Sequence, residues 1–307
     1  MKISEYIKSG TTILNSNNIF TLQKYEYIIS HFTSKFKNKY LFIPYEPQFL
    51  HNNDMVNVLS GINNKVILLS NLDVDFPPPK KPYEYDAYFD PAVLPENYLE
   101  IPYGQKIQTE VLPILLENNI KIFAHAVSIN HPNVTMIPGG VFSKFNHFHL
   151  KTNNKNNLCY ANFGLNCDRW FGNPRNEILE WIKNKDFVLK ENIISTEIVR
   201  RNTMNDTYYY HKIAQSKFAI CPRGCSLDTY RLWDCICLGC IPIVEKYGGY
   251  EQFEDLPILF IESYKDYGLL TEEYLNKAYG TMMQKEYNYS KLTFQYWLEK
   301  IQKYMEQ

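Results

Sequence analysis

The sequence predicts an α/β protein with two Rossmann-like domains, each built on a parallel sheet, that face each other across a cleft. Short apolar runs alternate with helical patterns through both halves of the 307-residue chain, separated by turns that contain Gly and Pro. A polar stretch at residues 143–157, SKFNHFHLKTNNKNN, interrupts this pattern near the middle. We therefore expect an N-terminal domain over residues 1–149, a C-terminal domain over 150–285, and a last helix at 286–307 that returns to the first domain.

The composition indicates a folded core without a charge bias. Hydrophobic residues make up 45% of the chain, and the formal net charge is -1, so the sequence offers no global basic surface for nucleic acid or a membrane. No stretch reaches the roughly 18 consecutive apolar residues of a membrane span. The first twenty residues also lack the apolar centre of a signal peptide. We expect a soluble, cytoplasmic protein without a transmembrane segment.

The first domain is expected to alternate buried strands with helices. Residues 76–102 are rich in Pro and Tyr and too long for a plain connection. They form either a flap that binds a substrate with its aromatic side chains or an ordered excursion on the domain surface. Pro113 is expected to bend or split the second helix. The patterns predict strands at residues 40–44, 65–70 and 121–126, and helices within residues 1–35 and 105–118.

Asp73 and Asp75 directly follow the strand at 65–70 and are candidate functional carboxylates. They are open to three interpretations. They can be ordinary loop residues, since Asp is common where a loop starts. One of them can face the cleft and act as a general base on an acceptor hydroxyl. The pair can also share a divalent cation, as two carboxylates on an extended segment do.

His125, in the strand at 121–126, is a further candidate base. The alternative is a histidine of the core whose hydrogen bonds are satisfied within the protein. Further along, Pro138, Gly139 and Gly140 form a turn in which adjacent glycines allow a close approach of backbone to a ligand or to a domain crossover.

The second domain repeats the alternation of strands and helices. Asn162 and Gly164 lie at the carboxyl end of its first strand, and Arg175 begins its first helix. Arg175 is either a phosphate ligand that faces the strand ends or a surface arginine. The patterns predict strands at residues 158–163, 187–193, 217–221, 241–244 and 258–261, and helices at 175–184, 208–215, 229–238, 271–279 and 289–304.

The most informative segment is residues 216–244, SKFAICPRGCSLDTYRLWDCICLGCIPIV. A buried strand is broken by a turn at residues 222–224. Ser226 and Asp228 offer N-cap side chains to a helix that starts near Thr229 and stops at Gly239. A second buried strand follows, which predicts a strand, helix and strand crossover in a parallel sheet.

Ionisable side chains in this segment predict a nucleotide-diphosphate site. Amides after Gly224 suit an anion, and Arg223 and Arg231 add forked donors that match phosphate oxygens. Asp234, one turn further along the helix than Arg231, is expected to accept hydrogen bonds from ribose hydroxyls. Since Arg231 and Asp234 lie three residues apart on one helix face, the alternative is that they simply pair with each other or with neighbouring groups.

The same residues carry a resemblance. Residues 216–244, followed by PILFI at 257–261, resemble the C-terminal half of exostosin-like glycosyltransferases. The usual glutamate of that family is Asp234 here, which keeps the carboxylate but shortens its reach by one methylene. The positions that match the family pattern are Ser216, Lys217, Phe218, Cys221, Pro222, Gly224, Asp228, Arg231, Trp233, Gly239, Ile241 and Pro242.

This resemblance implies the GT-B architecture and a nucleotide-sugar donor, with a UDP-sugar favoured. It implies an inverting transfer of the sugar to a hydroxyl of a glycan or a protein, with no metal cofactor required because arginines and a helix N-terminus face the diphosphate. Asp73, Asp75 and His125 remain the candidate bases. The residues expected on the donor side are Arg175, Arg223, Gly224, Asp228, Tyr230, Arg231 and Asp234.

Two other classes of function stay open. One is a nucleotide- or glycan-binding protein that has the same pocket but no base. The other is a metal-dependent transferase of the GT-A type that uses Asp73 and Asp75. The 7 cysteines, an odd number without a secretory signal, argue against a disulfide framework, and their clustering between Cys159 and Cys240 indicates buried thiols more than a zinc site.

Overall fold

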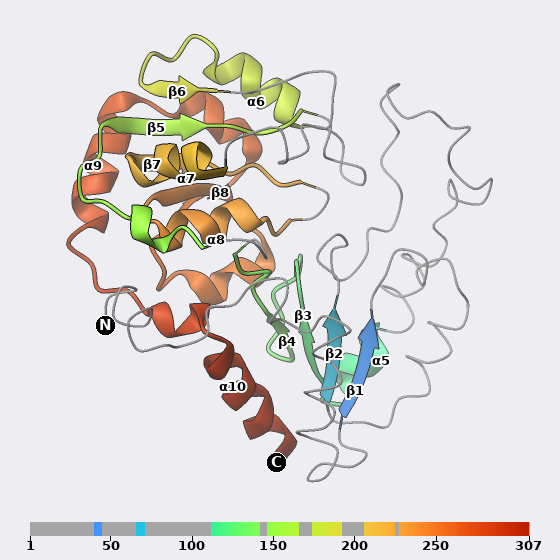
Figure 1. Cartoon of the computed structure of the whole chain (residues 1–307). Coiled ribbons are helices and arrows are strands. Elements are labelled where there is room, and N and C mark those ends of the chain that lie inside the picture. Colours follow the sequence, from blue (N-terminus) through green and yellow to red (C-terminus); the bar gives the residue numbers. More distant parts are fainter. Residues whose placement is uncertain are drawn as a thin grey trace, which may run out of the picture.

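The computed structural model describes residues 40–44, 66–70, 112–141, 146–165, 174–191, 206–224 and 227–306. These residues form a mixed α/β structure with two parallel sheets (Figure 1). The α/β class expected from the alternating patterns is thereby confirmed.

The first sheet has four strands in the order β1-β2-β3-β4, and each neighbouring pair is parallel. Because the order follows the chain, each strand is added at the same edge. The strands are β1 (Tyr40–Pro44), β2 (Val66–Ser70), β3 (Lys121–Ala124) and β4 (Val134–Met136).

The second sheet has five parallel strands in the order β6-β5-β7-β8-β9. The chain runs outward from β5 to β6, then crosses back to β7 on the other side of β5. This is the doubly wound order with its reversal point between β5 and β7, where the carboxyl ends of the strands leave a crevice that suits a ligand. The strands are β5 (Asn157–Ala161), β6 (Val188–Lys190), β7 (Ser216–Ile220), β8 (Ile241–Glu245) and β9 (Leu259–Ile261).

Helices connect and cover the strands. The helix at the centre of the most informative segment begins after Thr229, whose backbone is extended, and the chain turns at Gly239 with a φ of 72° that glycine adopts without strain. The α-helices are α5 (Leu112–Glu117), α6 (Pro174–Ile182), α7 (Asp206–Ala214), α8 (Tyr230–Cys237), α9 (Glu272–Met282) and α10 (Phe294–Glu306). The 3-10 helices are η5 (Phe148–Leu150), η7 (Gly248–Phe253), η8 (Tyr264–Leu269) and η9 (Tyr289–Leu292).

Side chains of the second sheet alternate between two cores, as the two-residue period of a strand requires. On β7, Phe218 and Ile220 join a cluster with α6 and α9, whereas Ala219 joins a cluster with α7 and α8. The sheet is therefore buried on both faces, which explains why its strands are apolar throughout.

The two sheets are in contact through the segment that follows β8. Backbone atoms of Ile129 and Asn130 lie so close to Gly248 that a Cβ on this glycine would be 2.3 Å and 2.4 Å from them. Gly249 donates its N–H to the carbonyl of Val127 at 3.0 Å. The larger core cluster spans this contact and contains residues of both sheets.

The C-terminal helix also touches the first sheet. The ring of Tyr304, near the end of α10, lies 5.8 Å from the ring of Phe123 on β3 in an edge-on arrangement. Lys121 of the same strand places its Nζ 5.3 Å from the centre of the Tyr304 ring. Figure 1 shows α10 leaving the second sheet and ending near the first.

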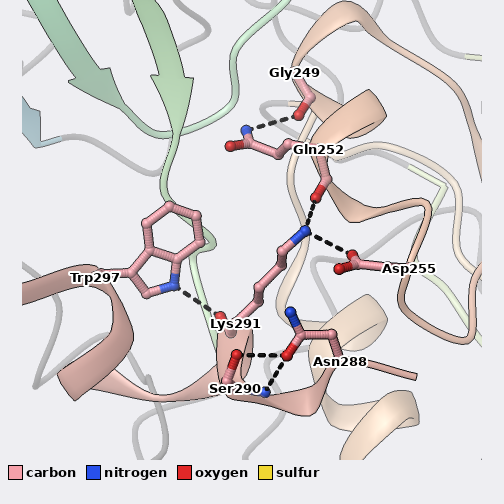
Figure 2. Close-up of polar contacts among 7 residues, drawn as sticks. All are labelled: Gly249, Gln252, Asp255, Asn288, Ser290, Lys291 and Trp297. Atoms are coloured by element: carbon pink, nitrogen blue, oxygen red, sulfur yellow. Dashed lines mark hydrogen bonds and ion pairs between the residues drawn. The ribbon is translucent and has the colours of Figure 1, made fainter. Parts of the chain in front are cut away.

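A polar network anchors the start of α10 to η7 (Figure 2). Lys291 donates to the carboxylate of Asp255 at 2.7 Å and to the carbonyl of Gln252, and Trp297 donates its indole N–H to the carbonyl of Lys291 at 2.7 Å. Gln252 in turn donates to the carbonyl of Gly249 at 2.9 Å. The return of the chain toward the first sheet is thus tied to the glycine pair at the contact.

Among the residues that the structure describes, no helix has the length and apolar character needed to cross a lipid bilayer.

Candidate functional site

The candidate site lies at the reversal point of the second sheet. The chain leaves β5 through residues 162–164 and leaves β7 through residues 221–224. Because β5 and β7 are parallel neighbours, these two segments emerge side by side at the same edge. Ligands of doubly wound sheets bind at this position.

Arg175, in the first turn of α6, joins these two segments. Its guanidinium donates to the carbonyl of Gly164 at 2.7 Å, to that of Arg223 at 2.8 Å and to that of Pro222 at 3.4 Å. The side chain is buried, and the ring of Phe163 lies beneath it at 6.0 Å. In this structure Arg175 therefore organises the walls of the site, and its expected contact with phosphate stays a prediction.

Gly224 fits against the same arginine. A Cβ at this position would lie 3.2 Å from an Nη atom of Arg175, which is tighter than an ordinary contact. The glycine thus lets the turn pack onto the guanidinium. Arg223 is partly buried, and its charge opposes the rise in the pKa of Tyr264 that burial and Glu177 cause. Arg223 therefore lies near Tyr264, which follows β9 at the carboxyl edge of the sheet.

Arg231 lies in the first turn of α8 and is partly buried. Its Nε donates to the hydroxyl of Tyr209 on α7 at 3.1 Å, and none of the ion pairs found among the described residues involves it. Burial opposes its charge, but Tyr209 and Cys221 outweigh that effect, so the pKa of the guanidinium lies above its ordinary value. The expected alternative, a pair between Arg231 and Asp234, is not among these contacts.

Asp234 lies one turn further along α8 and has no exposed surface. Its charge, together with burial, raises the pKa of the Cys237 thiol. The carboxylate thus faces the protein interior, and the expected contact of Asp234 with ribose stays a prediction.

Asp228 links the two sheets at the start of α8. One carboxylate oxygen accepts the N–H of Gly139 at 2.6 Å, and the other accepts the indole N–H of Trp233 at 2.7 Å. Burial raises the pKa of Asp228 to about 7, although these bonds and the N–H of Thr229 oppose the shift. The neighbouring Tyr230, another expected donor-side residue, is partly buried.

His125 follows β3 and is buried. Its Nδ1 lies 2.8 Å from the carbonyl of Ile137, so the N–H must be on Nδ1 and donate to that oxygen. Burial lowers the pKa of His125 to about 4, so the ring is neutral near pH 7. This geometry is that of the core alternative, and its role as a base stays a prediction.

Several predicted residues fall outside the described part of the chain. These are Asp73 and Asp75, together with Ser226. The five cysteines that the structure describes are buried and free, and within the described residues no group of His, Cys, Asp or Glu could hold a metal ion.

The structure also brings together residues that the sequence did not single out. Tyr209 is the hydrogen-bond acceptor of Arg231, and its ring lies 6.4 Å from that of Tyr160 on β5. The hydroxyl of Tyr160 accepts from Asn162 at 2.9 Å and donates to Glu191 at 3.3 Å. The sequence signal for Glu191 is a charged residue inside the strand predicted at residues 187–193.

The comparisons with known proteins point to the same segment. The family model of the Exostosin GT47 domain matches residues 148–258, which include β5 to β8 and every residue placed at the reversal point above. A search of curated proteins finds no match to this chain. Residues 148–258 are therefore similar to the Exostosin GT47 domain, in agreement with the resemblance that residues 216–261 carry.

Proposed function

We propose that this chain transfers a sugar from a nucleotide-diphosphate sugar, most favourably a UDP-sugar, to a hydroxyl of a glycan or protein acceptor. Arg231 carries the proposal. Its side chain is partly buried, and among the described residues it makes one hydrogen bond, to the neutral hydroxyl of Tyr209. No carboxylate of the described residues pairs with Arg231, so its forked donors are available to the oxygens of a bound diphosphate.

The donor half of the site would act mainly on the leaving group. In the transfer, the acceptor oxygen forms a bond to the anomeric carbon while the bond from that carbon to the diphosphate oxygen breaks. Negative charge then grows on the diphosphate. Arg231, Arg223 and the amides near Gly224 would stabilise that charge from fixed positions, which lowers the barrier.

A base must take the proton of the acceptor hydroxyl. Asp73, Asp75 and His125 are the candidates, all of them in the N-terminal half of the sequence. Direct attack opposite the leaving group gives an inverted anomeric centre, as the family resemblance implies. Of the three, Asp73 and Asp75 are the first choice, because a pKa of about 4 keeps the His125 ring neutral near pH 7 but makes it a weak base.

The acceptor and the donor would bind to different domains, as in a GT-B arrangement. Residues 1–149 would form the acceptor side, residues 150–285 the donor side, and residues 286–307 the returning helix. Two parallel sheets in contact, and α10 packed against β3, support this arrangement.

The binding experiment is a thermal-shift series with UDP, GDP, CDP, ADP and dTDP, each with manganese and with a chelator. Binding at 100 times the dissociation constant adds about 2.7 kcal/mol to stability, which gives a visible shift. We expect one nucleotide, UDP, to raise the melting temperature equally in both conditions. A shift that needs manganese would contradict metal independence and favour Asp73 and Asp75. No shift with any nucleotide would contradict the proposed donor class.

A further inference from the structure

Glu191 occupies a distinctive place in the second sheet. It directly follows β6, and its N–H donates to the carbonyl of Ala161, the last residue of β5, at 3.1 Å. The carboxylate therefore stands at the carboxyl end of the second strand of a doubly wound sheet, beside the reversal point. In the related Rossmann sheets that bind dinucleotides, an acidic residue beyond the first helix binds ribose hydroxyls.

The side chain of Glu191 is directed to the face of the sheet that carries Arg231. Successive residues of a strand point to opposite faces. Lys190 sends its Nζ to the carbonyls of Ile182 and Lys185, on the side of α6. Glu191 instead contacts hydroxyls of Tyr160 and of Tyr208 on α7. Since Arg231 bonds to Tyr209 on the same helix, both charged groups lie on the α7 side.

Within the described part of the chain, three side chains contact the carboxylate of Glu191 and hold it in place. One oxygen accepts the hydroxyl of Tyr160 at 3.3 Å and the other accepts that of Tyr208 at 3.1 Å, while Nζ of Lys212 lies at 3.6 Å. An ionised carboxylate offers about four acceptor positions, so these three contacts with described residues leave about one position for a hydroxyl of a ligand. The side chain is 19% exposed, which leaves it open to a ligand.

Glu191 and Arg231 both act on the hydroxyl of Tyr160. Burial raises the pKa of Tyr160, Glu191 adds to that rise, and Arg231 opposes it, so both charges act on the same group. Asn162 fixes this hydroxyl with its amide at 2.9 Å. A nucleoside diphosphate carries its ribose diol and its diphosphate next to each other. The protein side chains that bind these two groups must therefore also be close to each other. Asp234, by comparison, is fully buried.

We propose that Glu191 binds the ribose hydroxyls of the nucleoside diphosphate while Arg231 binds its diphosphate. This assignment rests on the proposed function and names the residue that selects a ribonucleotide. Tyr160 and Tyr208 are positioning residues, because they hold the carboxylate and do not need to touch the ligand.

The test compares UDP with 2′,3′-dideoxy-UDP by isothermal titration. We expect the wild type to bind UDP at least about tenfold more tightly than the dideoxy form, since hydrogen bonds to a charged acceptor are the stronger ones. Glu191→Gln should bring this ratio close to one while leaving the affinity for dideoxy-UDP nearly unchanged. Tyr208→Phe, at a half-exposed position, should reduce the ratio by a smaller factor.

Two further variants control the comparison. Glu299→Gln makes the same chemical change at an exposed position of α10, away from the candidate site, and should keep the wild-type ratio. Asp234→Asn tests the other carboxylate. A ratio that survives Glu191→Gln, or that is lost only in Asp234→Asn, would overturn the assignment of ribose to Glu191 while leaving the proposed function intact. If the wild type binds neither nucleotide, the proposed function fails, and this inference fails with it.

Discussion

His125 and Asp228 are buried ionisable side chains whose pKa values move in opposite directions. Burial lowers the pKa of His125 to about 4 and raises that of Asp228 to about 7. In each case burial favours the neutral form. The two residues therefore give stability opposite dependences on pH.

Removing the titration of His125 should flatten the loss of stability in acid. The unfolded chain takes up a proton near the ordinary histidine pKa of about 6.5, whereas the folded chain does so only near 4. Stability from this group is therefore present above pH 6.5 and is lost as the pH falls to 4, by at most about 3 kcal/mol. His125→Asn keeps a donor for the carbonyl of Ile137 and should lower this slope in urea unfolding between pH 4 and 6.5.

The pH dependence of the His125 variant must be compared with that of the wild type, because Asp228 changes the free energy of unfolding with pH in the opposite direction. The raised pKa of Asp228 means that its contribution falls as the pH rises from about 4 to 7. The readout is thus the difference between variant and wild type at each pH. His211→Asn, which removes an exposed histidine on α7, should follow the wild-type slope. Equal slopes for His125→Asn and the wild type would contradict the account of His125.

At the scale of the element, periodicity predicted most strands and helices of the described chain. The strand at residues 40–44 was predicted with the bounds that the structure has, and the helix at 229–238 is α8 within one residue at each end. Pro113 lies in the first turn of α5, where proline is tolerated, and residues 105–111 of the predicted helix lie outside the described part of the chain. Local signals sufficed here because burial repeats with the period of each element.

Partners of the polar residues could not be predicted in the same way. Arg175 bonds to carbonyls 11, 47 and 48 residues away, and Asp228 bonds to an N–H 89 residues away. Only the packing of β5 beside β7, and of one sheet against the other, creates these pairs. Residue type and spacing therefore point to a candidate site at the ends of β5 and β7, but they do not tell which of its arginines bonds to backbone carbonyls of the protein.

At the scale of the whole molecule, the contact between the sheets depends on two glycines. Gly248 and Gly249 allow the segment after β8 to approach the backbone after β3. Figure 1 shows these segments between the two sheets, and Figure 2 shows the polar network that connects Gly249 to α10. Close packing at this point fixes how the donor and acceptor sides of the proposed site would meet.

A methyl group at Gly248 should loosen this contact. Its Cβ would be 2.3 Å from backbone of Ile129, which cannot turn away as a side chain does. We expect Gly248→Ala to lower the free energy of unfolding by about 1–3 kcal/mol, as overpacking does. The matched control is Gly280→Ala on α9, where nothing lies within 4 Å and alanine should stabilise the helix. The measurement is the melting temperature of both variants by calorimetry. An unchanged melting temperature for Gly248→Ala would contradict the described contact.

The most direct test of the proposed function is to measure UDP affinity and unfolding free energy together for Arg231→Gln. The account predicts an affinity loss of about tenfold or more, since charge-assisted bonds to phosphate are strong. It predicts little change in stability, because the guanidinium makes one hydrogen bond, to Tyr209, in the described structure. The control is Lys183→Gln, which removes a half-exposed positive charge just after α6. It should change neither the UDP affinity nor the free energy of unfolding. Unchanged UDP affinity, or a stability loss as large as the affinity loss, would contradict the assignment of Arg231 to the donor diphosphate.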